Sequence, residues 1–271
     1  MIENDNENLL SDPRPVTIIG NWKMNKTIME AKTFVAGLAV ATTHCSSKIG
    51  LAVPYTMIEQ AAEVARGTSV VIGAQNVSSE EEGAFTGEIS CNQLKDAGAS
   101  FVIIGHSERR GYYHEDYSVI NRKVYLSINS GLKVIMSIGE MSEQHQKGKV
   151  NEVLKDQLKR GLEGIDAFGK DQLMIAYEPL WAIGTNLAAT PEVVQSVHHF
   201  CRQTLAKLKG ENFAERVQIL YGGSVKPDNA AELLNLPDVD GLLVGGASLS
   251  LDSFTKIIQC QQTYKSHVEI K

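Results

Sequence analysis

The sequence predicts a single parallel (β/α)8 barrel, and three observations carry this prediction. The chain has 271 residues, a length at which an α/β barrel commonly forms one unit. Short apolar, β-branched segments alternate with longer amphipathic ones along the whole chain, which is typical of repeated βαβ units. Hydrophobic residues make up 43% of the chain but aromatic residues only 6%, so the core must be mainly aliphatic, as in parallel strands covered on both faces.

Eight apolar segments are the expected strands. They lie at residues 16–21, 49–53, 69–74, 101–105, 133–138, 173–177, 217–221 and 241–244. Residues 101–104, Phe-Val-Ile-Ile, are the clearest case of a strand buried on both faces. Helices are expected between the strands, for example at 27–41, 117–130, 150–162, 191–208 and 228–234, with Pro191 and Pro227 at first-turn positions. About eight units favour a closed barrel, although periodicity alone leaves an open doubly wound sheet as the alternative.

The chain has no linker or change of composition that would divide it. Residues 16–271 are therefore expected to form one domain and residues 1–15 a flexible leader. The leader is acidic and Asn-rich, without the features of a signal peptide, and no apolar run approaches the roughly 20 residues that span a bilayer. A net charge of −6 argues against nucleic-acid or membrane partners. Four widely spaced cysteines fit reduced thiols in a cytoplasmic protein rather than a metal site.

Distinctive residues follow several of the expected strands, and in a barrel the ends of the strands meet at one face. Lys23 follows the first strand, although a lysine there is more often a solvated charge. His106 follows the fourth, with charged residues directly behind it, and is a candidate acid or base. Glu178 follows the sixth and precedes a Pro-led, largely apolar loop of the kind that closes over a ligand.

Glycine pairs directly follow the last two expected strands, as Gly222-Gly223-Ser224 and Gly245-Gly246. Glycine lets backbone N–H groups converge on an anion, and the loops after strands seven and eight of a barrel often bind phosphate. Each pair alone would also fit an ordinary turn. The interpretation as a phosphate site therefore depends on the other segments.

Together these segments resemble the triosephosphate isomerase family over residues 16–266. The matching tracts are Gly-Asn-Trp-Lys-Met-Asn at 20–25, Gly-Ala-Gln-Asn at 73–76, Gly-Ala-Phe-Thr-Gly-Glu-Ile-Ser at 83–90, Gly-His-Ser-Glu-Arg-Arg at 105–110, Tyr-Glu-Pro-Leu-Trp-Ala-Ile-Gly-Thr at 177–185 and Leu-Tyr-Gly-Gly-Ser-Val at 220–225. The resemblance implies a TIM barrel that interconverts dihydroxyacetone phosphate and D-glyceraldehyde 3-phosphate through an enediolate. It implies a role in glycolysis and gluconeogenesis, with neither cofactor nor metal.

The resemblance also implies roles for individual residues. Glu178 would be the catalytic base, His106 a neutral electrophile and Lys23 the catalytic cation, which is the known pattern of this family. The substrate would be bound by Asn21, Lys23, Gly184, Ser224, Gly245 and Gly246. Glu108 resembles an acid that pairs with Lys23. The loop at residues 75–88 resembles the one with which the family forms homodimers, where Thr86 would brace the partner's Asn21 and Lys23; the alternative is an acidic surface loop.

The sequence departs from the family at three places. Asn186 and Leu187 stand where Gly-Lys is usual, which puts the motion of the loop in doubt but not the chemistry. Ser137 replaces a very common cysteine, and His145 lies in a tract that usually carries arginine; both are expected to affect packing and stability.

Other functions remain as alternatives. A phosphate-binding epimerase or a Schiff-base lyase is one rival, but the lyase would need a lysine such as Lys133, which lies at the wrong end of its strand. A barrel retained only for binding predicts the loss of Lys23, His106 or Glu178, and none of the three is lost.

Overall fold

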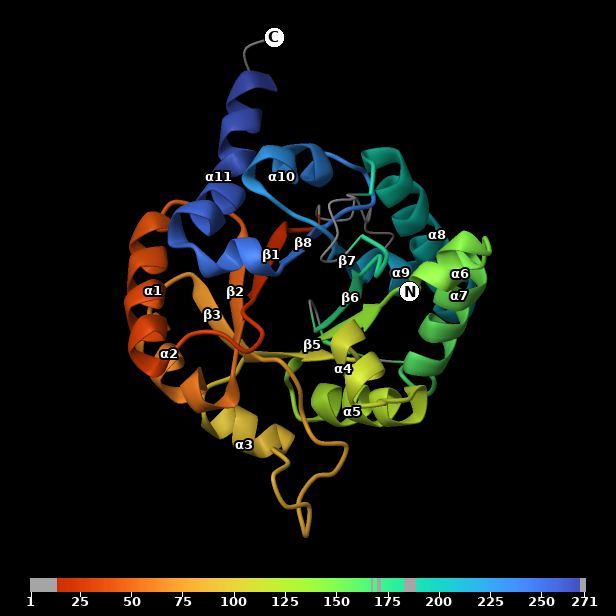
Figure 1. Ribbon diagram of the computed structural model, residues 1–271, viewed down its shortest axis with the longest axis horizontal. Coiled ribbons are helices and arrows are strands. Elements are labelled where there is room, and N and C mark those ends of the chain that lie inside the picture. Colours follow the sequence, from red (N-terminus) through yellow and green to blue (C-terminus); the bar gives the residue numbers. More distant parts are fainter. Residues whose placement is uncertain (1–13, 167, 170–171, 183–188, 269–271) are drawn as a thin grey trace, which may run out of the picture.

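The computed structural model describes residues 14–166, 168–169, 172–182 and 189–268, with side chains up to residue 260. Within these residues eight parallel strands close into a barrel in sequence order, and helices surround it (Figure 1). The strands are β1 (Thr17–Asn21), β2 (Lys48–Val53), β3 (Val70–Ala74), β4 (Phe101–Ile104), β5 (Lys133–Ile138), β6 (Leu173–Tyr177), β7 (Gln218–Tyr221) and β8 (Gly241–Val244). The expected barrel is confirmed, and an open sheet is excluded because β1 pairs with both β2 and β8.

The helices form the outer layer of the barrel. They are α1 (Ile28–Ala41), α2 (Ile58–Ala65), α3 (Cys91–Asp96), α4 (Ser107–Tyr112), α5 (Tyr117–Asn129), α6 (Ser142–Gln146), α7 (Val150–Gly161), α8 (Pro191–Lys209), α9 (Glu211–Arg216), α10 (Pro227–Leu234) and α11 (Leu251–Val268), with 3-10 turns η1 (Tyr55–Met57) and η2 (Gly246–Leu249). Local chemistry explains where several of these helices begin. Thr27 caps α1 through a capping box with Glu30, and Pro191 and Pro227 occupy the first turns of α8 and α10, as expected.

Side chains alternate between the inside of the barrel and the helices outside. The inner cluster consists of Ile19, Ala52, Phe101, Ile103, Ile135, Met174, Ala176, Leu220 and Leu243. Intervening residues such as Ile18 and Ile104 belong to the larger cluster between strands and helices. Because the alternation has a period of two, Asn21, Ser137 and Glu178 continue the inner faces of β1, β5 and β6 at their carboxyl ends. The three polar side chains are buried.

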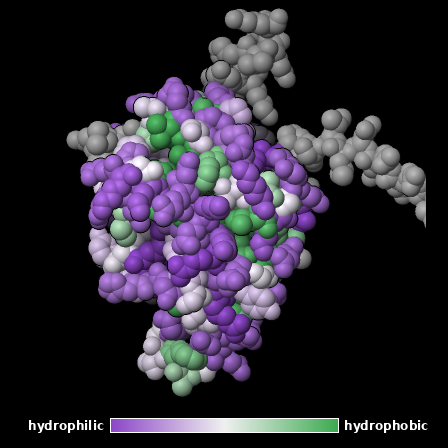
Figure 2. Space-filling view, turned by 90° about the vertical axis from the view of Figure 1, so that its right-hand side faces the viewer, coloured by the Kyte–Doolittle hydropathy of each residue, from purple (hydrophilic) through white to green (hydrophobic). Residues whose placement is uncertain are grey.

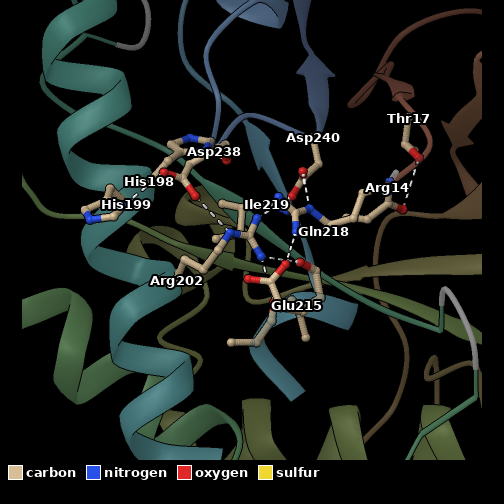
Figure 3. Close-up of polar contacts among 12 residues, drawn as sticks. Arg14, Thr17, His198, His199, Arg202, Glu215, Gln218, Ile219, Asp238 and Asp240 are labelled. Atoms are coloured by element: carbon tan, nitrogen blue, oxygen red, sulfur yellow. Dashed lines mark hydrogen bonds and ion pairs between the residues drawn. The ribbon is translucent and has the colours of Figure 1, made fainter. Parts of the chain in front are cut away.

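A cluster of ion pairs joins the chain before β1 to the chain before β8 (Figure 3). Arg202 on α8 contacts Asp238 through Nε at 3.0 Å and Asp240 through Nη2 at 2.6 Å. Asp240 also accepts a hydrogen bond from Arg14 Nε at 2.6 Å, and Arg14 Nη1 lies 2.6 Å from Glu215 on α9. Pairing offsets the cost of burying these charges. Arg14 is part of the expected leader, whose residues 1–13 lie outside the described residues.

No described helix is long and apolar enough to cross a membrane. Over the same residues, no group of three or more His, Cys, Asp or Glu side chains is arranged to hold a metal ion. The four cysteines are free, and Cys91 and Cys201 are buried.

Candidate active site

A cavity of about 420 Å³ lies at the carboxyl ends of the strands. Its lining includes the expected site residues Asn21, Lys23, His106, Glu178, Ser224, Gly245 and Gly246. They come from the end of β1 and from the loops after β1, β4, β6, β7 and β8, which the closed barrel brings to one end. Gly184, together with Asn186 and Leu187, lies outside the described residues. Lys133, which the lyase alternative requires, is exposed at the start of β5, at the opposite end of that strand.

Glu178 directly follows β6, and its side chain is only 1% exposed. Its Oε2 accepts a hydrogen bond from the Ser107 backbone N–H at 3.0 Å, and its Oε1 accepts one from the Ser137 hydroxyl at 2.9 Å. A Cβ atom at Gly139 would come within 1.9 Å of the Glu178 carbonyl oxygen, so only glycine fits beside this backbone. The carboxylate is therefore held at a fixed depth, where water is largely excluded and a carboxylate can act as a base.

His106 directly precedes α4 and is buried. The Glu108 backbone N–H donates to its Nδ1 at 3.2 Å, which assigns the ring proton to Nε2 and makes the imidazole neutral. Nε2 lies 3.5 Å from Glu178 Oε1. That separation is too long for a good hydrogen bond, so the Nε2–H can donate to another group in the cavity. The geometry agrees with the neutral electrophile that the family resemblance implies.

Lys23 adopts a backbone conformation that is uncommon for a residue with a side chain, with φ of 53°. Two neighbours hold it there: Asn21 Oδ1 accepts from the Lys23 N–H at 3.2 Å, and Gln75 Nε2 donates to the Lys23 carbonyl at 3.0 Å. The Lys23 ammonium lies 2.6 Å from Glu108 Oε1, the charge pair expected from the sequence. The strain is thus offset by contacts that aim the ammonium at the cavity.

Small residues at the ends of β7 and β8 leave space along the cavity. A Cβ atom added to Gly246 would have no heavy atom within 4 Å, and one added to Gly245 would lie 3.9 Å from Lys23 Cε. Gly246 also begins the 3-10 turn η2. Backbone N–H groups in such turns form concave sites that suit an anion. This end of the cavity can therefore hold the phosphate of a small substrate beside Lys23.

Comparisons with known proteins agree with this arrangement. The model of a family described as triosephosphate isomerase matches residues 16–261. A triosephosphate isomerase of Protochlamydia amoebophila is 46% identical over 245 residues, covering 90% of this chain and 93% of the relative. That of Carboxydothermus hydrogenoformans is 45% identical over 243 residues, covering 89% and 97%. The chain belongs to the triosephosphate isomerase family.

A solved structure supports the same assignment. The crystal structure of triosephosphate isomerase from Bartonella henselae matches with a TM-score of 0.84 and 37% identity, covering 92% of this chain and 99% of that one. The family, the fold and the enzyme class expected from the sequence, an isomerase, are thereby confirmed.

Two contacts in this candidate site were not expected from the sequence. Ser137 was expected to affect packing and stability, but its hydroxyl also contacts the carboxylate of Glu178. Gln75 lies in a tract that matches the family, yet its amide holds the carbonyl groups of both Lys23 and Ala52, each at 3.0 Å. A signal for Ser137 exists in the sequence, because it lies two residues after the inward-facing Ile135 at a strand end.

Trp181 lies near the start of the loop after Glu178, and it packs against His145, one of the departures from the usual family sequence. The Trp181 indole donates to Glu140 Oε1 at 2.7 Å, and the ring of His145 stacks on it with centroids 4.3 Å apart. Tyr177 donates to the same Glu140 oxygen at 3.1 Å. Burial and then the charge of Glu140 raise the pKa of the Tyr177 hydroxyl, which keeps its proton. His145 on α6 therefore packs against the start of this loop.

Proposed function

We propose that the chain interconverts dihydroxyacetone phosphate and D-glyceraldehyde 3-phosphate, with Glu178 as the base, His106 as the electrophile and Lys23 as the substrate-binding cation. One observation carries the proposal. A buried carboxylate and a neutral imidazole lie 3.5 Å apart in a cavity that is also lined by Lys23 and by the glycine-rich ends of β7 and β8. This set provides for proton transfer, polarisation of a carbonyl and binding of a phosphate in one place.

The carboxylate of Glu178 removes a proton from the substrate carbon next to the carbonyl group. The electron pair moves toward the carbonyl oxygen and gives an enediolate, and Glu178 returns the proton to the neighbouring carbon. The donors from Ser107 and Ser137 keep the carboxylate in place, since a displacement of about 1 Å can cost a factor of about 100 in rate.

His106 stabilises the negative charge that develops on the two substrate oxygens. A neutral imidazole whose Nδ1 is occupied by a backbone donor presents its Nε2–H to these oxygens, without first having to lose a proton. A fixed donor of this kind is worth most in a site from which water is excluded. The reaction moves a proton within one molecule, so the proposal requires no cofactor or metal.

Lys23 and the backbone of Ser224, Gly245 and Gly246 bind the phosphate. The Lys23 side chain is one-third exposed and its ammonium has three donors, so the contact with Glu108 leaves donors for a substrate. Asn21, which accepts a hydrogen bond from the Lys23 backbone and lines the same cavity, is part of the proposed substrate-binding set. Gly184, which lies outside the described residues, belongs to the same proposed set. Residues 16–271 would form the single catalytic domain, with 1–15 as a leader, in a cytoplasmic enzyme of glycolysis and gluconeogenesis.

We further propose that two chains form a homodimer through the loop between β3 and α3. The loop stands away from the barrel in Figure 1, and its projecting tip carries hydrophobic surface in Figure 2. Thr86 and its neighbour Phe85, which is 47% exposed, belong to this loop. A cavity of about 260 Å³ beside Asn21 and Lys23, edged by the exposed Met24 and Tyr113, would receive the tip from the partner.

An enzyme-coupled assay with dihydroxyacetone phosphate tests the proposed reaction, and Glu178→Asp tests the base. Shortening the side chain by one methylene retracts the carboxylate by about 1 Å and is expected to lower kcat by about 100-fold or more. Glu152→Asp, on an exposed side chain of α7, is the matched control and keeps full activity. Turnover by Glu178→Asp close to that of the unchanged chain would remove Glu178 from the role of base.

A further inference from the structure

Ser137 is a fully buried serine at the end of β5 whose hydroxyl points at the proposed base. An ionised carboxylate can only accept hydrogen bonds, so the hydroxyl donates to Glu178 Oε1, at 2.9 Å. The sheet fixes this contact: Ser137 pairs in register with Ala176, two residues before Glu178, and shares its inward face with Ile135. The donor therefore belongs to the rigid barrel and not to a loop.

The same carboxylate oxygen lies 3.5 Å from His106 Nε2. Two N–H or O–H groups are thus near Oε1, and only the Ser137 hydroxyl is within good hydrogen-bonding distance. If the hydroxyl were missing, a small shift of either side chain would let the imidazole N–H donate to the carboxylate. Such a bond would engage the base and the electrophile with each other, and it would have to break before either could act on a substrate.

We propose that Ser137 is a positioning residue that satisfies Oε1 of Glu178 and thereby keeps the Nε2–H of His106 free for the substrate. The inference rests on the proposed roles of Glu178 and His106. It concerns a residue that acts through the base, because Ser137 itself does not line the cavity. The consequence is that one buried hydroxyl determines whether the two reacting groups stay separate.

The substitution Ser137→Ala removes the donor without adding bulk. A hydrogen bond to a charged group then forms between His106 and Glu178, and breaking it is expected to lower kcat by about 10- to 100-fold. KM should stay within about twofold, because the phosphate-binding backbone is untouched. Ser137→Cys keeps the buried shape but has a weaker donor, so its kcat should lie between that of the unchanged chain and that of Ser137→Ala. Ser127→Ala is the control: Ser127 is also fully buried, on α5, and is expected to change neither parameter.

Proton NMR of the imidazole N–H gives a readout that a purely structural role would not move. The His106 Nε2–H signal, assigned by its loss in His106→Asn, should move downfield in Ser137→Ala as the new hydrogen bond forms. An unmoved signal, or an unchanged kcat, overturns the proposal for Ser137, even if thermal stability falls. Failure of the base assignment would look different, since Glu178→Asp would then keep its turnover.

Discussion

Replacing Gly222 with alanine would move the proposed base by a distance that the structure defines. A Cβ atom at this position would lie 3.0 Å from Glu178 Cγ and 3.2 Å from the Tyr177 carbonyl oxygen, whereas ordinary contacts begin at 3.4 Å. The Tyr177 carbonyl is held by the Gly222 N–H at 2.8 Å, so the Glu178 side chain is the part that can move. The carboxylate should shift by about 0.5 Å.

A shift of this size has a predictable effect on the reaction. If 1 Å costs about 100-fold, half of that distance costs about 10-fold in kcat, or about 1.4 kcal/mol in activation free energy. KM should change less than kcat, because Lys23 and the glycines that follow β8, which are proposed to bind the phosphate, remain in place. The coupled assay with dihydroxyacetone phosphate measures both parameters.

Gly111→Ala is the control for this prediction. Gly111 lies on α4, has no atom within 4 Å of its added Cβ and does not have a positive φ. It should keep full turnover. If Gly222→Ala folds with an unchanged melting temperature and also keeps full turnover, the position of the Glu178 carboxylate does not limit the rate, and the reasoning is refuted.

Two further predictions concern pH and assembly. Burial lowers the pKa of His198 to about 4, so between about pH 6.5 and 4 the unfolded chain binds a proton that the folded chain does not, and stability falls as the pH falls. His198→Asn should therefore reduce the loss of unfolding free energy between pH 7 and pH 4.5 by about 2 to 3 kcal/mol in urea titrations; equal losses in both chains would contradict this. Sedimentation velocity at micromolar concentration should give twice the chain mass of 29.6 kDa, and a fully active species of one chain mass would argue against the dimer.

The strands could be located from the sequence to within one residue, because buried parallel strands are continuous apolar runs that end at polar or glycine residues. The one-residue errors have local causes. The fourth strand was expected to include Gly105, but a φ of +72° takes this glycine out of the strand after Ile104. Such a backbone angle leaves no mark in the hydrophobic pattern.

The residues of the cavity could be predicted where a charged side chain follows a strand, as for Lys23, His106 and Glu178. The contacts of Ser137 and Gln75 could not be predicted. The alternation of the strand places Ser137 on the inner face, but the side chain that it meets depends on which strands are neighbours and on the stagger between them. The contact between Ser137 and Glu178 joins β5 and β6 across 41 positions of the chain. A serine near the end of an apolar strand is otherwise an ordinary residue, and its significance comes from the carboxylate beside it.

The ion pair between Arg14 and Asp240 has a consequence for how the chain folds during synthesis. The two residues are 226 positions apart, and they join the chain before the first strand to the chain before the last. Until β8 has left the ribosome, β1 has only β2 as a partner, and one of its edges remains open. The pairing of β1 with β8, which closes the barrel, is therefore among the last steps of folding. It has to bring together two strands that are separated by most of the chain. A growing chain must protect that open edge from other chains until β8 has been made.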